Sequence, residues 1–329
     1  MMYNVLSKKK AIQLLGVGVL AFSLAACNEE NSSEKTSDQK TEQSSQAKST
    51  TRVVTDAMGH KVKIPANPKR VIASYLEDNL VALGITPVAQ WSVGDGASIQ
   101  DYLQDKLGKV PTISYDLPFE SVQKLKPDLI IMDSAQMVEG NKYEQYSKIA
   151  PTYVIGKEQN NDWRDELLRV GDVFDKKDQA QEILDKYDEK VTKAKTEIND
   201  AVGTPSVAAV WLFGGKFYMV NEKLSTGAVL YQDLGLKVPA VVKEISAKST
   251  SNWNEISLEK LVELDADHIF LVNGDAQKAK STLSNKLWQS IPAVKAGNVH
   301  EFSSKESWLY TGPIANEQIV DNVVKSLAK

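Results

Sequence analysis

The sequence predicts an α/β protein in which two α/β lobes, each with a mostly parallel sheet flanked by helices, are joined by a single long helix. Short apolar runs such as RVIASY and DLIIMD alternate with helical patterns in both halves of the chain, which is typical of parallel strands linked by helices. Between the halves, residues 162–200 contain no proline and place Ile183, Leu184, Tyr187 and Val191 at helical spacing. This middle segment predicts the long helix.

Residues 1–26 are predicted to be a lipoprotein signal peptide. Lys8, Lys9 and Lys10 give a basic start, AIQLLGVGVLAFSL is an apolar run too short to span a bilayer comfortably, and LAAC closes the segment. LAAC resembles the bacterial lipobox. That resemblance implies cleavage before Cys27, attachment of a diacylglyceryl group there and, in some bacteria, an amide-linked fatty acid such as palmitate. The alternative is a plain signal peptide with a chance cysteine.

Cys27 is the only cysteine, so the chain can form neither an internal disulfide nor a cysteine-based metal site. The region 27–51 consists of this cysteine and a segment with no aliphatic or aromatic residue larger than alanine, which predicts a disordered tether. The N-terminal lobe is expected over 52–165, the linking helix region over 166–201 and the C-terminal lobe over 202–329.

The strands of the N-terminal lobe are expected at RVIASY, PVAQW, DLIIMD and TYVIG. The helical pattern that follows has a break near Gly171. In the C-terminal lobe, Gly214 and Gly215 lie between two β-rich runs in SVAAVWLFGGKFYMV, which predicts a hairpin. The runs DHIFLV and NVHEFS predict further strands, and a closing helix is expected from about Asn316.

Two stretches, FESVQKLKPDLII and LEKLVELDADHIF, share one skeleton. Glu120 matches Glu259 and Asp128 matches Asp267 at a single offset (259 − 120 = 139). The same helix-into-strand unit is therefore expected once in each lobe, opening each time on a glutamate. A glutamate in a first helical turn also favours the helix dipole, by about 0.3–1 kcal/mol.

Several motifs occur in an order that resembles the siderophore-binding lipoproteins of bacterial ABC importers. They are the lipobox, the polar tether, IPANPKRVIA, LKPDLII, IAPTYVI, LYQDLGLKVP and ISLEKLVELDADHIFLV. The resemblance covers about residues 52–329. It implies a ligand cleft between the lobes, capture of a ferric siderophore, and delivery to an ABC permease dimer with its cytoplasmic ATPase. It also implies a lipid-anchored monomer on the extracellular face of the membrane, as in Gram-positive bacteria, with Glu120 and Glu259 docking onto the permease.

Binding sites of α/β lobes lie at the carboxyl ends of strands, and those positions here are rich in aromatic residues. Such side chains cover apolar surface while their N–H or O–H groups donate hydrogen bonds, which suits a bulky amphipathic ligand. The best candidates are Trp91, Trp211 and Trp308. The full set of expected ligand-binding residues is Tyr75, Trp91, Tyr115, Trp211, Phe213, Tyr218, Trp253, Lys305, Trp308 and Tyr310.

The charge of the expected cleft limits the classes of ferric siderophore that it could bind. In the relatives that bind trianionic ferric catecholates, arginines occupy positions that correspond here to Trp211 and Phe213. Burying a trianion without fixed cations is costly, so a neutral, cationic or weakly anionic ferric hydroxamate is expected. Lys305 and Lys216 could supply charge, although Lys216 fits a solvent-exposed turn better than a binding role. Ferric catecholate, ferric citrate and haem remain alternatives.

Other function classes lack their signatures. The chain has three histidines, His60, His268 and His300, spread along the sequence and interpreted as structural, so a site for bare Zn²⁺ or Mn²⁺ is not expected. VGDGAS lacks the third glycine of a dinucleotide motif, and no GxSxG, P-loop or HExxH occurs, so neither catalysis nor a cofactor is expected. The net charge of −4, without a basic cluster, gives no reason to expect a nucleic-acid partner.

Overall fold

The computed structural model describes residues 51–94, 96, 98–158, 160–274 and 276–328, without the side chains of 276–278. The predicted signal peptide, Cys27 and nearly all of the tether lie outside the described residues. Within the described part, no helix has both the length and the apolar character needed to cross a membrane.

The N-terminal lobe contains a parallel sheet in the order β3-β6-β7, a parallel pair β4-β5 whose strand β4 contacts β3, and an antiparallel pair β1-β2. Its elements are β1 (Thr51–Thr55), β2 (Lys61–Pro65), β3 (Val71–Ala73), α1 (Glu77–Ala82), β4 (Gln90–Ser92), η1 (Asp101–Leu103), α2 (Gln104–Leu107), β5 (Thr112–Ser114), α3 (Phe119–Lys124), β6 (Leu129–Ser134), η2 (Ala135–Val138), α4 (Lys142–Ile149), β7 (Thr152–Gly156) and α5 (Trp163–Val173).

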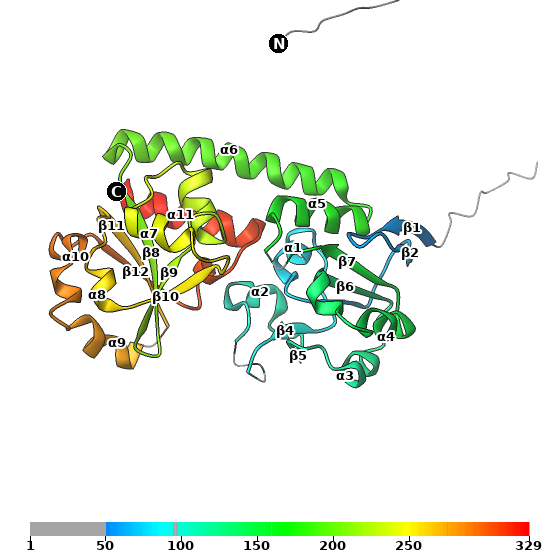
Figure 1. The fold of residues 1–329 in the computed structure, drawn as a ribbon. Coiled ribbons are helices and arrows are strands. Elements are labelled where there is room, and N and C mark those ends of the chain that lie inside the picture. Colours follow the sequence, from blue (N-terminus) through cyan, green and yellow to red (C-terminus); the bar gives the residue numbers. More distant parts are fainter. Residues whose placement is uncertain (1–50, 95, 97, 159, 275, 329) are drawn as a thin grey trace, which may run out of the picture. The chain divides into compact units, whose positions relative to one another are not determined.

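The long helix is α6 (Lys177–Val202), which packs on α5 and on the last helix of the chain, α11 (Pro313–Leu327) (Figure 1). The predicted break exists, between α5 and α6. Gly171 explains why the two helices can cross closely there, because a Cβ atom at this position would lie 2.7 Å from the Cβ of Ala180. The α6 face that packs inward carries Leu184, Tyr187 and Val191, at the spacing the sequence indicates.

The C-terminal lobe has one five-stranded sheet in the order β10-β9-β8-β11-β12, in which β8, β11 and β12 are parallel. The predicted hairpin joins β8 to β9, and Gly214 and Gly215 both have positive φ, as its tight turn requires. Its further elements are β8 (Val207–Phe213), β9 (Lys216–Val220), the π-helix η3 (Ala228–Asp233), α7 (Ala240–Ser246), β10 (Trp253–Ile256), α8 (Leu258–Leu261), β11 (His268–Asn273), α9 (Ala276–Leu283), η4 (Trp288–Ser290), α10 (Pro292–Lys295), β12 (Val299–Ser303) and η5 (Ser307–Leu309).

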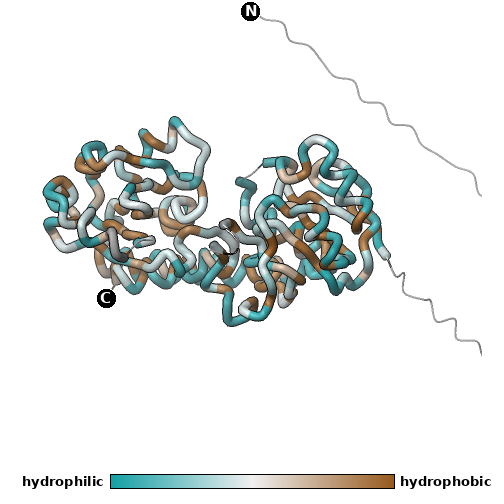
Figure 2. The backbone as a smooth tube through the Cα atoms, turned by 90° about the horizontal axis from the view of Figure 1, so that it is seen from below, coloured by the Kyte–Doolittle hydropathy of each residue, from teal (hydrophilic) through white to brown (hydrophobic). Residues whose placement is uncertain are grey.

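The apolar residues of the central strands are buried, and Figure 2 shows hydrophobic stretches, in brown, in both lobes. One buried cluster spans the C-terminal lobe, α5, α6 and part of the N-terminal sheet, and a smaller one lies under α3 and α4. The prediction of two α/β lobes with mostly parallel sheets is confirmed. The repeated unit is also present, as α3 followed by β6 and as α8 followed by β11, with Glu120 and Glu259 exposed in the second position of each helix.

Candidate functional site

Three predicted aromatic residues lie at the carboxyl ends of neighbouring strands in the N-terminal lobe. Tyr75 follows β3, Trp91 lies in β4 and Tyr115 follows β5. The ring centroids of Tyr75 and Trp91 are 4.9 Å apart, and those of Trp91 and Tyr115 are 6.5 Å apart, both in edge-on geometry. The Trp91 indole N–H donates to the carbonyl oxygen of Tyr115 at 3.0 Å, which fixes the indole ring.

Tyr310, although it belongs to the C-terminal part of the chain, joins this N-terminal group. Its ring centroid lies 6.2 Å from that of Tyr75 and 5.4 Å from that of Tyr102. Its hydroxyl donates to the carbonyl oxygen of Ile99 at 2.8 Å. Tyr102 was not among the predicted site residues, because it lies in a polar segment that carries no strand pattern.

Four other predicted residues form a second aromatic group in the C-terminal lobe. The ring of Trp211 lies 5.1 Å from that of Tyr218, 5.2 Å from that of Phe213 and 6.2 Å from that of Trp253, centroid to centroid. The indole N–H groups of Trp211 and Trp253 are shielded from solvent and have no hydrogen-bond partner among the described residues. Phe213 exposes 51% of its surface at the end of β8. This group therefore combines unused donors with an exposed apolar ring.

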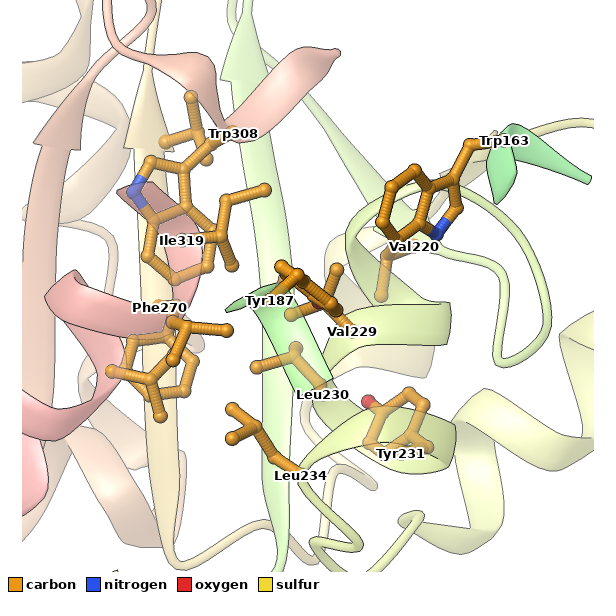
Figure 3. Packing of buried hydrophobic residues seen from close by; sticks show 14 of the residues in the cluster. Trp163, Tyr187, Val220, Val229, Leu230, Tyr231, Leu234, Phe270, Trp308 and Ile319 are labelled. Carbon is orange, nitrogen blue, oxygen red and sulfur yellow. The ribbon is translucent and has the colours of Figure 1, made fainter. Parts of the chain in front are cut away.

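Trp308, by contrast, lies in the hydrophobic core. Its side chain is fully buried, with ring centroids 5.1 Å from Phe270 and 4.5 Å from Phe302, and it lies close to Ile319 of α11 (Figure 3). The prediction that Trp308 lines the cleft is wrong, because the short helix η5 turns its ring inward instead of toward the strand ends. Lys305 lies in the exposed turn after β12, where it remains only a candidate.

Three carboxyl side chains near Tyr75 were not singled out by the sequence patterns: Glu77 is buried, and Asp133 and Glu166 are half-buried. Glu77 is 2% exposed and accepts the backbone N–H of Trp91 at 2.7 Å. Asp133, at the end of β6, accepts the hydroxyl of Ser74 at 2.6 Å. Burial raises the pKa of Glu77 to about 7, that of Glu166 in α5 to about 8, and that of Asp133 above its usual range.

Asp78, the neighbour of Glu77, connects the two lobes. Its two carboxylate oxygens accept the backbone N–H groups of Ile314 and Ala315, each at 2.9 Å, in the first turn of α11. The Tyr102 hydroxyl donates to the same carboxylate at 2.8 Å. Burial raises the pKa of Asp78 to about 6, and these three hydrogen bonds oppose that rise. A negative charge at a helix N-terminus is stabilising, so Asp78 acts as the cap that α11 lacks locally.

Two cavities adjoin these residues. The larger, of about 1040 Å³, lies beyond the ends of β6 and β7 and is lined mostly by polar residues of both lobes, with none of the predicted aromatic residues in its wall. The smaller, of about 90 Å³, is lined by Tyr75, Asp133 and Glu166 among others. The cavities share four lining residues, Asn160, Lys223, Leu224 and Asn252.

The strand order places these features along one edge of the N-terminal sheet. The strand ends follow each other as β5, β4, β3, β6 and β7, so Tyr115, Trp91, Tyr75, Asp133 and Lys157 succeed one another along it. Along this row of strand ends, the residues at the ends of β5, β4 and β3 are aromatic and the residue after β7 is polar. The carboxyl side chain of Asp133 lies between them, at the end of β6. Within the described part of the chain, no three His, Cys, Asp or Glu side chains are arranged to hold a metal ion.

The sequence is similar to a known family and to proteins of known name. Residues 78–305 match the family model described as periplasmic binding protein. The probable siderophore-binding lipoprotein YfiY of Bacillus subtilis is 32% identical, over 96% of this chain and 97% of its own. The iron(3+)-hydroxamate-binding protein FhuD of Bacillus subtilis is 30% identical, over 94% and 95%.

The structure also resembles a solved one. Staphylococcus aureus SirA, crystallised with staphyloferrin B, superposes with a TM-score of 0.68 at 26% identity, and the match covers 84% of this chain and 98% of SirA. The family predicted from the ordered motifs is thus confirmed by the sequence matches and by the similarity in fold. This chain belongs to the periplasmic binding protein family.

Proposed function

We propose that the protein captures a ferric siderophore outside the cytoplasm and delivers it to an ABC permease for iron uptake. The observation that carries this proposal is the row of aromatic side chains at the carboxyl edge of the N-terminal sheet, with Tyr75 and Trp91 in contact at 4.9 Å. Rigid aromatic faces of this kind suit a large, amphipathic ligand. The similarity to proteins named for binding siderophores and iron(3+)-hydroxamates supports it.

We infer a ferric hydroxamate as the cargo because fixed cations are scarce near the aromatic groups. Lys216, beside Phe213, is paired with Glu255 at 2.9 Å. Arg164, which lines the small cavity, is paired with Asp233 at 3.0 Å. A trianionic ferric catecholate would meet the carboxyl groups of Glu77, Asp133 and Glu166 beside Tyr75, at a large desolvation cost. Ferric citrate and haem are the competing cargoes.

The permease contacts are proposed at Glu120 and Glu259. Both are exposed, and each lies at the same place in the repeated unit of its lobe. Two similar lobes that meet two similar permease subunits should present similar anchors, and charge pairs across an interface govern steering and register. The protein itself is proposed to act as a monomeric carrier without catalysis, anchored to the outer face of the cell membrane by lipid on Cys27.

The cargo proposal is tested by titrating the purified protein and following quenching of its tryptophan fluorescence. The ligands are ferric hydroxamates, ferric catecholates, ferric citrate and haem. Saturable binding that is tightest for a ferric hydroxamate is expected, because the site holds aromatic rings and few free cations. Tightest binding of a ferric catecholate or of haem would show that the cargo assignment is wrong.

A further inference from the structure

The first turn of α11 is capped by a side chain from the other lobe. A helix is usually capped by the side chain of its own N-cap residue, but here that residue is Gly312, which has none. Asp78 of α1 accepts the backbone N–H groups of Ile314 and Ala315 instead, each at 2.9 Å. The start of α11 therefore depends on a residue more than 200 positions earlier in the chain.

Gly312 is what allows Asp78 to approach so closely. A Cβ atom at this position would lie 2.6 Å from the carboxyl carbon of Asp78. The φ angle of Gly312 is 141°, a conformation that residues with a side chain rarely adopt. The backbone before α11 and the carboxylate of Asp78 thus fit each other as a pair.

The same contact holds Tyr310, which lies two residues before Gly312. The Tyr310 hydroxyl donates to the carbonyl oxygen of Ile99 at 2.8 Å, and its ring centroid lies 5.4 Å from that of Tyr102. The Tyr102 hydroxyl in turn donates to Asp78 at 2.8 Å. A closed circuit of contacts therefore runs from Asp78 through Tyr102 to Tyr310, and back to Asp78 through the start of α11.

Tyr310 brings the C-terminal part of the chain to the aromatic row of the N-terminal lobe. Its ring centroid lies 6.2 Å from that of Tyr75, which contacts Trp91 at 4.9 Å. The next residue, Thr311, lines the small cavity together with Tyr75. If Asp78 released the first turn of α11, the segment that carries Tyr310 would lose one of its two attachments to the N-terminal lobe.

The burial of Asp78 indicates what this contact is suited for. Asp78 is 1% exposed and forms no ion pair within the described part of the chain. Burying a carboxylate without a cation has a large desolvation cost, which offsets much of what its three hydrogen bonds contribute. The contact is therefore better suited to fixing a geometry than to stabilising the fold.

We propose that Asp78 is a positioning residue of the ligand site, which caps α11 from the opposite lobe and so holds Tyr310 against Tyr75. Because Asp78 is buried, it acts through Tyr310 and does not contact the ligand itself. This inference rests on the proposed function and deepens it, since it assigns a role in siderophore binding to a residue outside the aromatic row.

The test is a double-mutant cycle on the affinity for ferrioxamine B, a ferric trihydroxamate, measured by quenching of tryptophan fluorescence. Asp78→Asn keeps the size of the side chain but replaces one acceptor oxygen by an NH₂ group, and it should weaken binding about tenfold. Tyr310→Ala removes an aromatic face and should weaken binding by a similar factor. The double variant should be no weaker than Tyr310→Ala alone, because Asp78 acts through that ring.

Asp128→Asn is the matched control. Asp128 also accepts two backbone N–H groups, those of Lys69 and Arg70, but it precedes β6, at the end of the strand opposite to Asp133. This variant should bind ferrioxamine B like the parent, and melting temperatures establish that each variant is folded. If Asp78→Asn does not fold, Tyr102→Phe decides, since it removes only the hydroxyl that donates to Asp78 and should weaken binding about threefold.

Parental affinity in a folded Asp78→Asn protein would overturn the inference, and so would parental affinity in Tyr102→Phe where Asp78→Asn does not fold. Single effects that multiply to about a hundredfold in the double variant would show that Asp78 and Tyr310 act independently. An equal loss of affinity in Asp128→Asn would show that binding follows stability alone. Failure of the proposed function gives a different result, in which the parent binds no ferric siderophore at all.

Discussion

Asp128 and Asp267, separated by 139 positions (267 − 128), make the same contact in the two lobes. Each lies just before a central strand, and its carboxylate accepts a backbone N–H from the segment that precedes the neighbouring strand. The N–H of Lys69 donates to Asp128 and that of Ser206 donates to Asp267, both at 2.7 Å. The aspartates of the repeated unit therefore have a structural role that the glutamates do not share.

The first prediction concerns the glutamates of that unit. Glu120 and Glu259 are exposed, and their carboxylates form no hydrogen bond or ion pair within the described residues. The double variant Glu120→Ala, Glu259→Ala should bind siderophore like the parent, yet lose more iron uptake than either single variant. Uptake of radioactive iron by cells that express equal amounts of each protein provides the measurement.

Thermal unfolding separates docking from helix stabilisation. The free energy of unfolding of the glutamate variants should fall by at most about 0.3–1 kcal/mol, which is the contribution of a negative charge in the first turn of a helix. Asp128→Ala is the contrasting variant, because it removes the charged acceptor of two backbone N–H groups and should lower the free energy of unfolding by about 1–3 kcal/mol. Full uptake by the double glutamate variant would exclude the docking role.

The second prediction concerns Trp308. Since its ring is fully buried against Phe270 and Phe302, Trp308→Ala should lower the free energy of unfolding by about 3–5 kcal/mol. Urea denaturation measures this loss. Trp308→Phe is the milder companion variant and should remain folded with parental siderophore affinity. A folded Trp308→Phe protein with much weaker binding would mean that the residue contacts ligand after all.

The third prediction is that stability falls as the pH rises. Burial raises the pKa of Glu77 to about 7 and that of Glu166 to about 8, so the folded state holds protons that the unfolded state releases near pH 4.5. This stabilisation is complete below about pH 4.5 and is lost as the pH rises through 7 and 8, by up to about 1.4 kcal/mol per pH unit for each group.

Denaturation midpoints measured between pH 5 and 9 give the slope of stability against pH, which tests this prediction. Glu77→Gln and Glu166→Gln should each flatten it and raise stability at pH 8 relative to the parent, because a neutral amide needs no proton. Glu197→Gln, which removes one negative charge from an exposed position of α6, is the control and should leave the slope unchanged. If the Glu77→Gln and Glu166→Gln variants both kept the parental slope, the assignment of the pH dependence to these two groups would be refuted.

The fourth prediction concerns Cys27, which lies outside the described residues. If Cys27 is lipidated, the protein should fractionate with membranes and enter the detergent phase on partitioning. Cys27→Ser should move the protein to the soluble fraction or to the medium, because the substitution removes the site of lipid attachment. Detergent partitioning that is the same with and without the cysteine would argue against a lipid anchor.

The features of the fold that the sequence predicted correctly are those that depend on residues close together in the chain. The helical spacing of α6, the Gly214-Gly215 turn and the repeated unit all depend on residues close together in the chain. Aromatic residues at strand ends were located for the same reason, because the carboxyl ends of parallel strands share an edge.

The features that the sequence missed depend on distant packing. Glu77 and Asp78 look like ordinary solvated acids of a first helical turn, but Asp78 is covered by Tyr102 and by α11, which is more than 200 positions away. The sequence around Trp308 has no periodicity, so the direction in which its ring points could not be predicted from its neighbours. The π-helix η3 likewise has no distinguishing signal, since its apolar spacing fits an α-helix equally well.

The affinity of a ferric trihydroxamate for the parent, Trp91→Ala and Trp211→Ala proteins tests the central claim most directly. Calorimetric titration should give saturable binding of one ligand per protein. Each substitution should weaken it by about 1–3 kcal/mol, because each removes a rigid aromatic face from the site. A parent protein that binds no ferric siderophore, or two folded variants with parental affinity, would contradict the account.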